Sequence, residues 1–486
     1  MSDFLAATGV LVAAAACAAS ILLPPGRPRS LAMLVAIGLF PVLILGDQWH
    51  TTQIVDLRHD DARIAALLLA GAIIVVLLTY VFRRWPVLLP LAIVAALPFR
   101  VPLHAGGDTA NLLVPLYLVI AAGVLFTLLR DWDSPPSTWA PRPLAWTLAA
   151  FVVLYAVQAL YSGDFSKGLQ NICFFLVPFT VAYRLLREVE WDRRLLTLVL
   201  VVVGAEAVAF VLIGSVEYLS RSLFWNDQVI RSNEFHTYFR VNSVFWDPNV
   251  YGRYLALVIV VAMAALLWVR ERRGFALLTA LVAVLWLGLA QTFSQSSFIA
   301  LLAGLAVLAA LRWSWRWTLA AVLTGLVGAV LVVTLVGGSG KVNFSRINID
   351  TSGRANLVSG GLELFSERPI QGYGSGSFQT AYRDHRANKD APVTVSHTEP
   401  VTIAAEQGLL GLLFYVALIV VALWTMTSGI RGSPTAVAAR AAVLAAFVAL
   451  LVHTMSYAGF FEDPITWVLL AIGASLAHAP AVREPT

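Results

Sequence analysis

Long apolar stretches follow one another along most of the chain, and polar residues gather in the segments between them. A bilayer core about 30 Å thick is crossed by about 20 mostly apolar residues in helical form. Because these runs are continuous and do not alternate, they predict membrane-spanning helices and not the short strands of a membrane barrel. The fifteen runs lie at about 4–23, 31–46, 62–82, 86–98, 112–129, 143–161, 168–186, 195–217, 250–269, 275–292, 297–311, 318–337, 408–428, 440–459 and 464–478.

Composition supports this prediction and bounds the number of spans. Of 486 residues, 59% are apolar and 13% are charged, whereas soluble domains are about half apolar and about a quarter charged. The runs 86–98, 297–311 and 464–478 are short enough to be re-entrant, so we expect about 13–15 spans. The first run lacks a basic segment before it, which favours a retained helix over a cleaved signal peptide. The expected fold is an all-α, polytopic membrane bundle.

The distribution of Lys and Arg predicts how the bundle is oriented. In a fifteen-span arrangement, 18 of the 33 basic residues fall on one side, which is then the cytoplasmic side. Of the other 15, 11 lie in the stretches 221–253 and 341–389, and long loops cross membranes largely regardless of charge. We therefore expect a cytoplasmic C-terminus, an extracytoplasmic N-terminus and two extracytoplasmic loops, 218–249 and 338–407.

The longer loop contains two glycine-rich strings that resemble nucleotide-binding motifs only superficially. Gly340-Lys341 lacks the first glycine and the Ser or Thr of a P-loop. Gly372-Tyr373-Gly374-Ser375-Gly376 lacks a flanking βαβ unit, so its glycines are interpreted as permitting a tight turn and close backbone approach. Helix-compatible apolar spacing over 357–365 predicts short helices in this loop.

The first polar cluster ends the loop 218–249. Asp247-Pro248-Asn249 is a helix-entry signal, because Asp or Asn caps free N–H groups and Pro fits the first turn. A plain helix cap followed by an Arg253 that extends to the membrane interface would explain these residues equally well. Arg240 lies just before this helix start, a position that favours anions.

Two further clusters lie in the loop 338–407. One consists of Arg354 and the glycine string around Tyr373, and the other of His397, Glu399 and Glu406. Taken alone, an outer-loop histidine is more often a solvated polar residue than a catalytic one. Glu406 also has a second interpretation, as a favourable negative charge in the first turn of a helix.

In order along the chain, these clusters resemble the O-antigen ligase and O-antigen polymerase superfamily of membrane glycosyltransferases. The matching strings are RVNSVFWDPNVYGRYL, TFSQSSFIALLAGL, SGRANL, ERPIQGYGSGSF and SHTEPVTIAAEQGLLG. The resemblance predicts an O-antigen ligase-like core over 195–460, preceded by helices without a recognisable motif (1–194) and followed by a last membrane segment and tail (461–486). Two positions depart from the family: Gln295 replaces a common Arg, which Arg253 or Arg346 would have to supply, and Thr398 replaces a common Asn.

The resemblance implies a bundle similar to other membrane glycosyltransferases with lipid-linked donors (the GT-C class), in a bacterial inner membrane, with a periplasmic active site. The donor is a glycan on undecaprenyl diphosphate and the acceptor is a sugar hydroxyl of a glycan or glycolipid. Arg240 and Arg354 are the candidate diphosphate ligands, because guanidinium groups match phosphate oxygens, and His397 is the candidate general base. The remaining candidate substrate-binding residues are Arg253, Glu399, Glu406, Tyr373, Asp247 and Asn249. No metal, cofactor or nucleic acid is implied.

Other functions stay open at this point. A polymerase that joins repeat units on the lipid would use the same donor and base as a ligase. A transporter or flippase of lipid-linked glycans would place ionisable residues at mid-membrane in two related halves, whereas this chain gathers them on one face and shows no repeat. Two residues lie deeper: Glu206, for which Arg253 or Arg240 is the natural partner, and His453, which is interpreted as a hydrogen-bonded core histidine.

Overall fold

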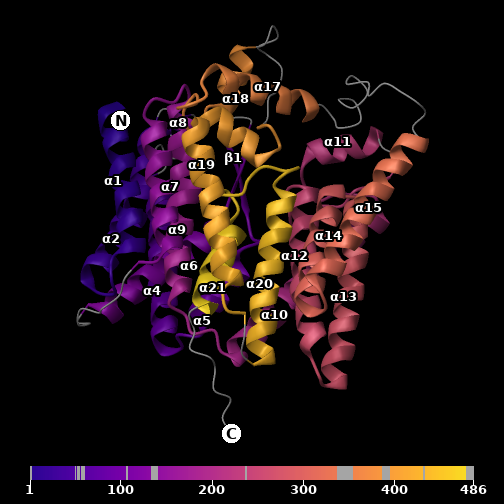
Figure 1. Cartoon of the computed structure of the whole chain (residues 1–486). Coiled ribbons are helices and arrows are strands. Elements are labelled where there is room, and N and C mark those ends of the chain that lie inside the picture. Colours follow the sequence, from indigo (N-terminus) through magenta and orange to yellow (C-terminus); the bar gives the residue numbers. More distant parts are fainter. Residues whose placement is uncertain are drawn as a thin grey trace.

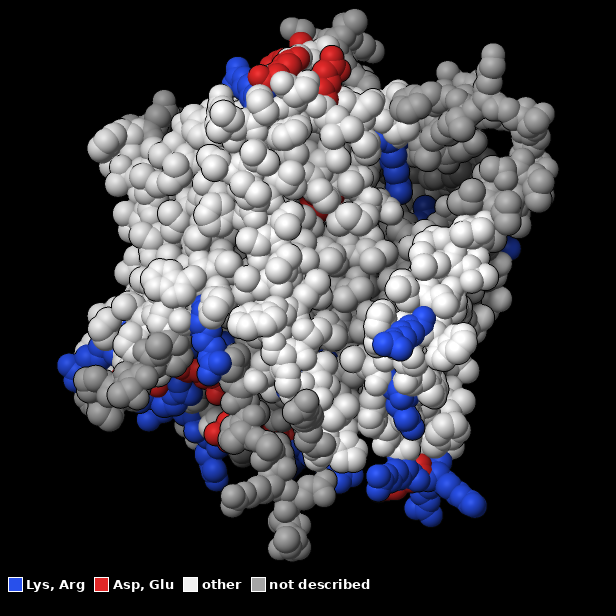
Figure 2. Space-filling view, in the orientation of Figure 1, with Lys and Arg blue, Asp and Glu red and all other residues white. Residues whose placement is uncertain are grey.

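The computed structural model describes residues 3–49, 51, 55, 61–105, 108–132, 141–235, 238–336, 354–385, 395–430 and 433–477. They form a bundle of helices that stand side by side (Figure 1). We call the end of the bundle that carries α11, α17 and α18 the loop end, and the opposite end the basic end. Lys and Arg side chains gather at the basic end, as the orientation prediction requires (Figure 2).

Every apolar run coincides with a helix. The helices are α1 (Asp3–Leu22), α2 (Arg27–Asp47), α4 (Asp61–Arg84), α5 (Leu88–Ala96), α6 (Val114–Asp131), α7 (Pro143–Ala159), α8 (Phe165–Asn171), the π-helical η1 (Ile172–Leu176), α9 (Val177–Arg187), α10 (Arg193–Ser220), α11 (Asp227–Phe235), α12 (Pro248–Trp268), α13 (Arg272–Thr292), α14 (Gln295–Arg312), α15 (Trp315–Val336), α17 (Arg354–Glu367), α18 (Phe378–Asp384), α19 (Glu399–Thr427), α20 (Pro434–His453) and α21 (Pro464–Leu476). Within the described residues, 11 helices are long and apolar enough to cross a membrane, with α7 and α21 as shorter apolar helices. The predicted polytopic helical bundle is confirmed, and α17 and α18 are the predicted short loop helices.

The run 86–98 does not form a complete span. Its helix, α5, has 9 residues, and at about 1.5 Å per residue it covers only half of the bilayer core. Pro98 and Pro102 follow and cannot continue the helix. The chain instead forms an antiparallel hairpin of β1 (Val101–Ala105) and β2 (Asp108–Leu112), which the apolar pattern did not predict.

One continuous apolar core runs through the bundle. Its residues come from α1 through α21, so the core crosses the predicted boundary at 194/195 without interruption. In the most apolar 18-residue stretch of Phe165–Arg187, 83% of the residues are buried, so this segment occupies the interior; in that of Ile64–Arg84 of α4 the share is 6%, so α4 lies at the periphery. Gly304 of α14 permits close packing against α12 and α20, because a Cβ there would come within 2.6 Å of Val260 and 3.2 Å of the Ala445 carbonyl.

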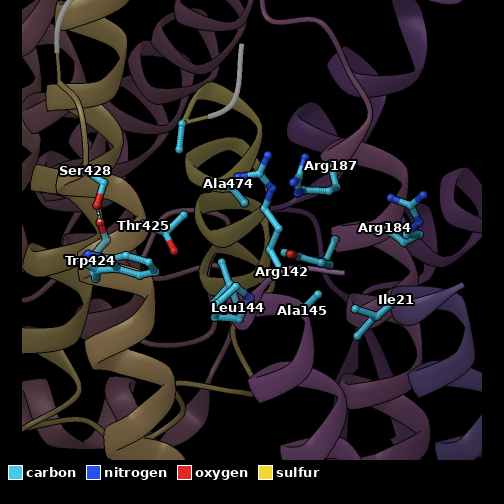
Figure 3. Close-up of a pocket in the computed structure, with 13 residues that line it drawn as sticks. Ile21, Arg142, Leu144, Ala145, Arg184, Arg187, Trp424, Thr425, Ser428 and Ala474 are labelled. Atoms are coloured by element: carbon cyan, nitrogen blue, oxygen red, sulfur yellow. Dashed lines mark hydrogen bonds between the residues drawn. The ribbon is translucent and has the colours of Figure 1, made fainter. Parts of the chain in front are cut away.

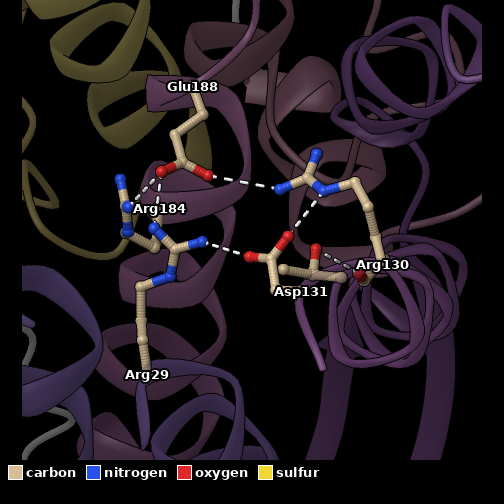
Figure 4. Close-up of polar contacts among 7 residues, drawn as sticks. Arg29, Arg130, Asp131, Arg184 and Glu188 are labelled. Atoms are coloured by element: carbon tan, nitrogen blue, oxygen red, sulfur yellow. Dashed lines mark hydrogen bonds and ion pairs between the residues drawn. The ribbon is translucent and has the colours of Figure 1, made fainter. Parts of the chain in front are cut away.

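A buried ion cluster fastens three helices at the basic end (Figure 4). Arg29 of α2 is fully buried and donates to Asp131 at the end of α6 and to Glu188 after α9. Arg130 contacts both carboxylates, and Arg184 contacts Glu188. Because each buried charge has an opposite charge beside it, the cluster avoids the large penalty of an unpaired buried ion.

Candidate active site

The segment before α12 holds Arg240 at the loop end. The Glu217 carboxylate, at the end of α10, accepts backbone N–H groups from Asn242 at 3.2 Å and Ser243 at 2.7 Å. The Asn233 side chain of α11 bonds both the N–H and the carbonyl of Arg240 at 3.0 Å. The backbone around Arg240 is therefore fixed from two sides, which limits where its side chain can point.

The guanidinium of Arg240 spans the ends of two membrane helices. Its Nε donates to the Thr292 carbonyl of α13 at 3.0 Å, and Nη2 donates to Asn249 Oδ1 of α12 at 3.0 Å. Burial lowers the pKa of Arg240, and the nearby Asp247 carboxylate opposes that shift. Three of the five guanidinium N–H donors are not used by these two bonds.

Asp247 caps α12 as the sequence predicted. Its Oδ1 accepts the N–H of Asn249 at 2.6 Å, and Pro248 occupies the first turn. The alternative interpretation of Arg253, as a side chain extending to the membrane interface, is wrong. Arg253 is buried and pairs with Asp463, the cap of α21, at 2.7 Å. Its role in substrate binding stays a prediction.

A chain of hydroxyls leads from Asn249 into the bundle. Asn249 Oδ1 accepts from Ser294 Oγ at 2.9 Å, and Ser294 lies 2.8 Å from Ser297 Oγ. The Nε2 of His453 lies 3.2 Å from Ser296 Oγ and 3.4 Å from Ser297 Oγ. His453 is fully buried, so its interpretation as a hydrogen-bonded core histidine is confirmed.

His397 lies directly before α19 in a backbone conformation that is rare for a residue with a side chain. Its φ is +60°, in the left-handed region. The next residues hold it there: Thr398 Oγ1 donates to the Met455 carbonyl at 3.1 Å, and the Glu399 N–H donates to the Thr454 carbonyl at 3.1 Å. Backbone strain that the surroundings enforce is a common feature of functional sites.

Arg354, the first residue of α17, brings a second guanidinium to the same place. Its Nη1 donates to the Ser456 carbonyl at 3.2 Å. Ser456 directly follows Thr454 and Met455, whose carbonyls accept the hydrogen bonds from the residues after His397. Burial lowers the pKa of His397, the positive charge of Arg354 lowers it further, and Asp247 opposes both effects. Arg354 and Asp247 also act on the pKa of Arg240.

The three predicted catalytic residues therefore converge at the loop end. Arg240, Arg354 and His397, with Asp247 and Tyr457 beside them, form what we call the arginine–histidine cluster. The His397 and Tyr457 rings are 6.0 Å apart. Members of the cluster come from the segments before α12 and α19, from the start of α17 and from the α20–α21 connection, so no short stretch of sequence contains the site.

The two predicted glutamates act on backbone N–H groups. Glu399 Oε2 accepts from Gly459 at 2.7 Å and Phe460 at 3.1 Å, which fixes the α20–α21 connection. Glu406 accepts from Gly376 at 2.9 Å and Phe378 at 3.1 Å. Glu406 therefore lies inside α19 and anchors the glycine string, in place of acting as a first-turn charge.

The glycine string is a tight turn wedged between two other segments, as interpreted. Gly372, Gly374 and Gly376 all have positive φ, at +67°, +98° and +82°. A Cβ on Gly374 would lie 2.3 Å from the Cα of Ser162, and one on Gly372 would lie 2.3 Å from the Glu406 carbonyl oxygen. The Tyr373 hydroxyl donates to Glu367, and the Arg368 guanidinium lies 4.3 Å from the centre of its ring; its role in substrate binding stays a prediction.

Replacing Gly374 with Ala is expected to lower the free energy of unfolding by about 3 kcal/mol or more, because left-handed strain and overpacking add. Gly429 provides the matched control: its φ is +66°, but an added Cβ would meet nothing within 4 Å. Gly429→Ala should therefore lose only about 1 kcal/mol from strain. Thermal unfolding of both purified variants measures the difference. Equal losses of unfolding free energy would contradict the tight packing of Gly374 against Ser162.

Glu206 pairs differently from the prediction. Its carboxylate accepts the Tyr254 hydroxyl at 3.2 Å, so the expected partnership with Arg253 or Arg240 is wrong. Successive residues on a helix are about 100° apart. Arg253 therefore faces α21 while Tyr254 faces α10.

Four residues near the site were missed, and two of them left a signal. Glu217 ends an apolar run, and Asp463-Pro464 repeats the helix-entry signal of Asp247-Pro248. The sequence around Tyr457 and Arg100 contains no comparable signal. Burial lowers the pKa of Arg100, which precedes β1, while Asp463 raises it and Arg253 lowers it, so Arg100 shares the Arg253–Asp463 environment. The suggested alternative, Arg346, lies outside the described residues.

Comparison with known families identifies part of this region. Residues 280–416 match the O-antigen ligase family. The match confirms the resemblance inferred from the sequence, and it extends from α13 into α19, so it includes Arg354 and His397. Arg240 and Asp247 come from the segment just before the O-antigen ligase match. No curated protein matches the chain. Among the described residues, no group of three or more His, Cys, Asp or Glu side chains is arranged to hold a metal ion.

Proposed function

We propose that this protein is a glycosyltransferase that moves a glycan from an undecaprenyl-diphosphate-linked donor to a sugar hydroxyl. The observation that supports it is the convergence of Arg240, Arg354 and His397 at one end of a membrane bundle, within and beside the O-antigen ligase match. The loop end would face the extracytoplasmic side of a bacterial inner membrane. A lipid-linked donor can reach this end by lateral diffusion with its diphosphate at headgroup level.

The arginines suit the leaving group. In the proposed reaction the acceptor oxygen bonds to the anomeric carbon, the bond from that carbon to the phosphate oxygen breaks, and undecaprenyl diphosphate leaves with the electron pair. Negative charge grows on the diphosphate as this bond breaks. Arg240 and Arg354 hold fixed positive charges in a partly buried site, where preorganised charge stabilises the transition state most effectively.

The histidine suits the acceptor. His397 lies beside Arg354, and the lowered pKa keeps its imidazole neutral at pH 7 and able to accept the proton of the attacking hydroxyl. The hydrogen bonds of Thr398 and Glu399 fix the backbone from which the His397 ring projects. Transfer to a final acceptor, as by a ligase, and joining of repeat units, as by a polymerase, would use the same three side chains.

A transfer assay with purified protein, a lipid-linked oligosaccharide and a glycolipid acceptor tests the proposal. We expect glycan transfer to the acceptor, and we expect saturating EDTA to leave the rate unchanged, because the guanidinium groups supply the positive charge at the diphosphate. Lengthened lipid-linked chains without acceptor modification would identify a polymerase. Loss of activity in EDTA that magnesium or manganese restores would refute the arginine scheme.

The orientation has its own test. Ser366 of α17 and Glu271 before α13 are both exposed, at the loop end and the basic end. Cys17 and Cys173 are buried and should not react with a membrane-impermeant maleimide. In intact cells with a permeabilised outer layer, Ser366→Cys should be labelled and Glu271→Cys only after lysis. Labelling of both from the same side would refute the topology.

A further inference from the structure

A cavity at the basic end has three arginines on its wall (Figure 3). Its volume is about 270 Å³, and Arg142, Arg184 and Arg187 line it. Arg142 precedes α7, and the other two belong to the last turn of α9. The remaining wall comes from the basic-end parts of α1, α7, α19 and α21, and it is mostly apolar, with Ile21, Leu144, Trp424 and Ala474 among its residues.

Positive charge is in excess around this cavity. None of the residues that line it is an Asp or a Glu. Glu188 pairs with Arg184 but is shared with Arg29 and Arg130 (Figure 4). The ion pairs of that cluster join the three arginines to two carboxylates, Glu188 and Asp131, so the cluster already carries an excess of positive charge. Glu190 and Asp192 line a neighbouring cavity on the Arg130 side. Arg142 and Arg187 therefore add to an existing positive excess.

The cavity also has the position of a lipid headgroup site. α1, α9, α19 and α21 all end beside it, and α7 begins there, so it lies where the apolar part of the bundle stops. Trp424 is 60% exposed on the surface of α19, and Trp146 is 55% exposed on α7. Tryptophan is enriched where membrane meets water. A ligand that fills this cavity meets guanidinium groups at one end and apolar side chains at the other.

We propose that this cavity binds an anionic phospholipid of the cytoplasmic leaflet. The phosphate would lie against Arg142 and Arg187, since guanidinium groups make paired, charge-assisted hydrogen bonds to phosphate oxygens. An acyl chain would lie along Leu144 and the exposed face of Trp424. Basic pockets between membrane helices on this side are suited to anionic headgroups. The bound lipid would connect α7, α9, α19 and α21, and would stabilise the bundle by mass action.

Thermal unfolding and native mass spectrometry of the detergent-purified full chain test this site. Phosphatidylglycerol should bind and raise the unfolding temperature, whereas phosphatidylcholine with the same acyl chains should do neither. The variant R142Q/R187Q should bind phosphatidylglycerol about tenfold more weakly, because two charge-assisted bonds are lost. R272Q/R273Q removes two exposed arginines at the same end, outside the cavity, and should bind like the wild type.

Each contrary result overturns the proposal. Equal binding of phosphatidylglycerol and phosphatidylcholine would remove the headgroup argument, and equal losses in the two double variants would make the effect one of general surface charge. A full temperature shift with soluble glycerol phosphate would identify a free-anion site. Arg142 is exposed, so R142Q alone should still fold if the double variant does not, and it should still weaken phosphatidylglycerol binding.

Discussion

Replacing His397 with Ala is expected to slow single-turnover glycan transfer by about 10²–10⁴-fold, the usual contribution of a general base. Donor affinity should stay nearly unchanged, because the diphosphate contacts assigned to Arg240 and Arg354 remain. His385 is the matched control. It is an exposed histidine of the same loop, paired with Glu367 at 2.9 Å, so His385→Ala should transfer at close to the wild-type rate.

The pH dependence follows from the surroundings of His397. A base acts when it is deprotonated, so the rate should fall as the pH falls through the pKa of His397. Burial and the charge of Arg354 hold that pKa below 6.5 in the free protein, so kcat/KM should lose activity only below this value. The bound diphosphate is negative and raises the pKa, which moves the acid limb of kcat to higher pH. His397→Ala should lack both limbs, and near-normal transfer by this variant would end the base assignment.

The helices were predictable because the apolar runs are long and each helix satisfies its own backbone in lipid. For α5 the sequence left two possibilities open: residues 86–98 are short enough to be re-entrant, but their pattern is apolar whether the chain crosses or turns back. Besides the shortness of the run, Pro98 and Pro102 indicate the break, but proline is tolerated in membrane helices. The hairpin pairs Val101–Ala105 with Asp108–Leu112, and the apolar pattern that predicted the spans carries no signal for it.

The sequence could predict which residues are candidates for the site, but it could not predict how their side chains are arranged. Family motifs placed Arg240, Arg354 and His397 in order along the chain, and the fold brings them together. What the motifs could not show is which side chains are used elsewhere. Arg253 is paired with Asp463, 210 residues away, and Glu406 anchors a turn 30 residues before it. Such pairings depend on which helix faces meet, and sequence alone leaves that open.

Arg354→Ala is expected to weaken donor binding by about tenfold and to slow transfer by about 10²–10³-fold, the loss typical of one preorganised donor. Arg240→Ala should cost at least as much, because Arg240 also ties α13 to α12 through Thr292 and Asn249. Arg383→Ala removes an exposed arginine from the neighbouring α18 and should leave both quantities unchanged.

Arg354→Lys separates charge from geometry. Among the described residues, Arg354 donates to the Ser456 carbonyl, a bond that an ammonium group can also make, so the substitution should disturb the fold little. Lysine keeps the positive charge but is a single point of charge without a planar fork, and it cannot bond two phosphate oxygens in parallel. We therefore expect Arg354→Lys to regain part of the donor affinity lost in Arg354→Ala while transfer stays at least about tenfold slow. Donor titration and single-turnover rates measure the two effects separately. A lysine variant with wild-type binding and rate would show that Arg354 supplies charge alone, and an alanine variant with unchanged donor affinity would remove Arg354 from the diphosphate site.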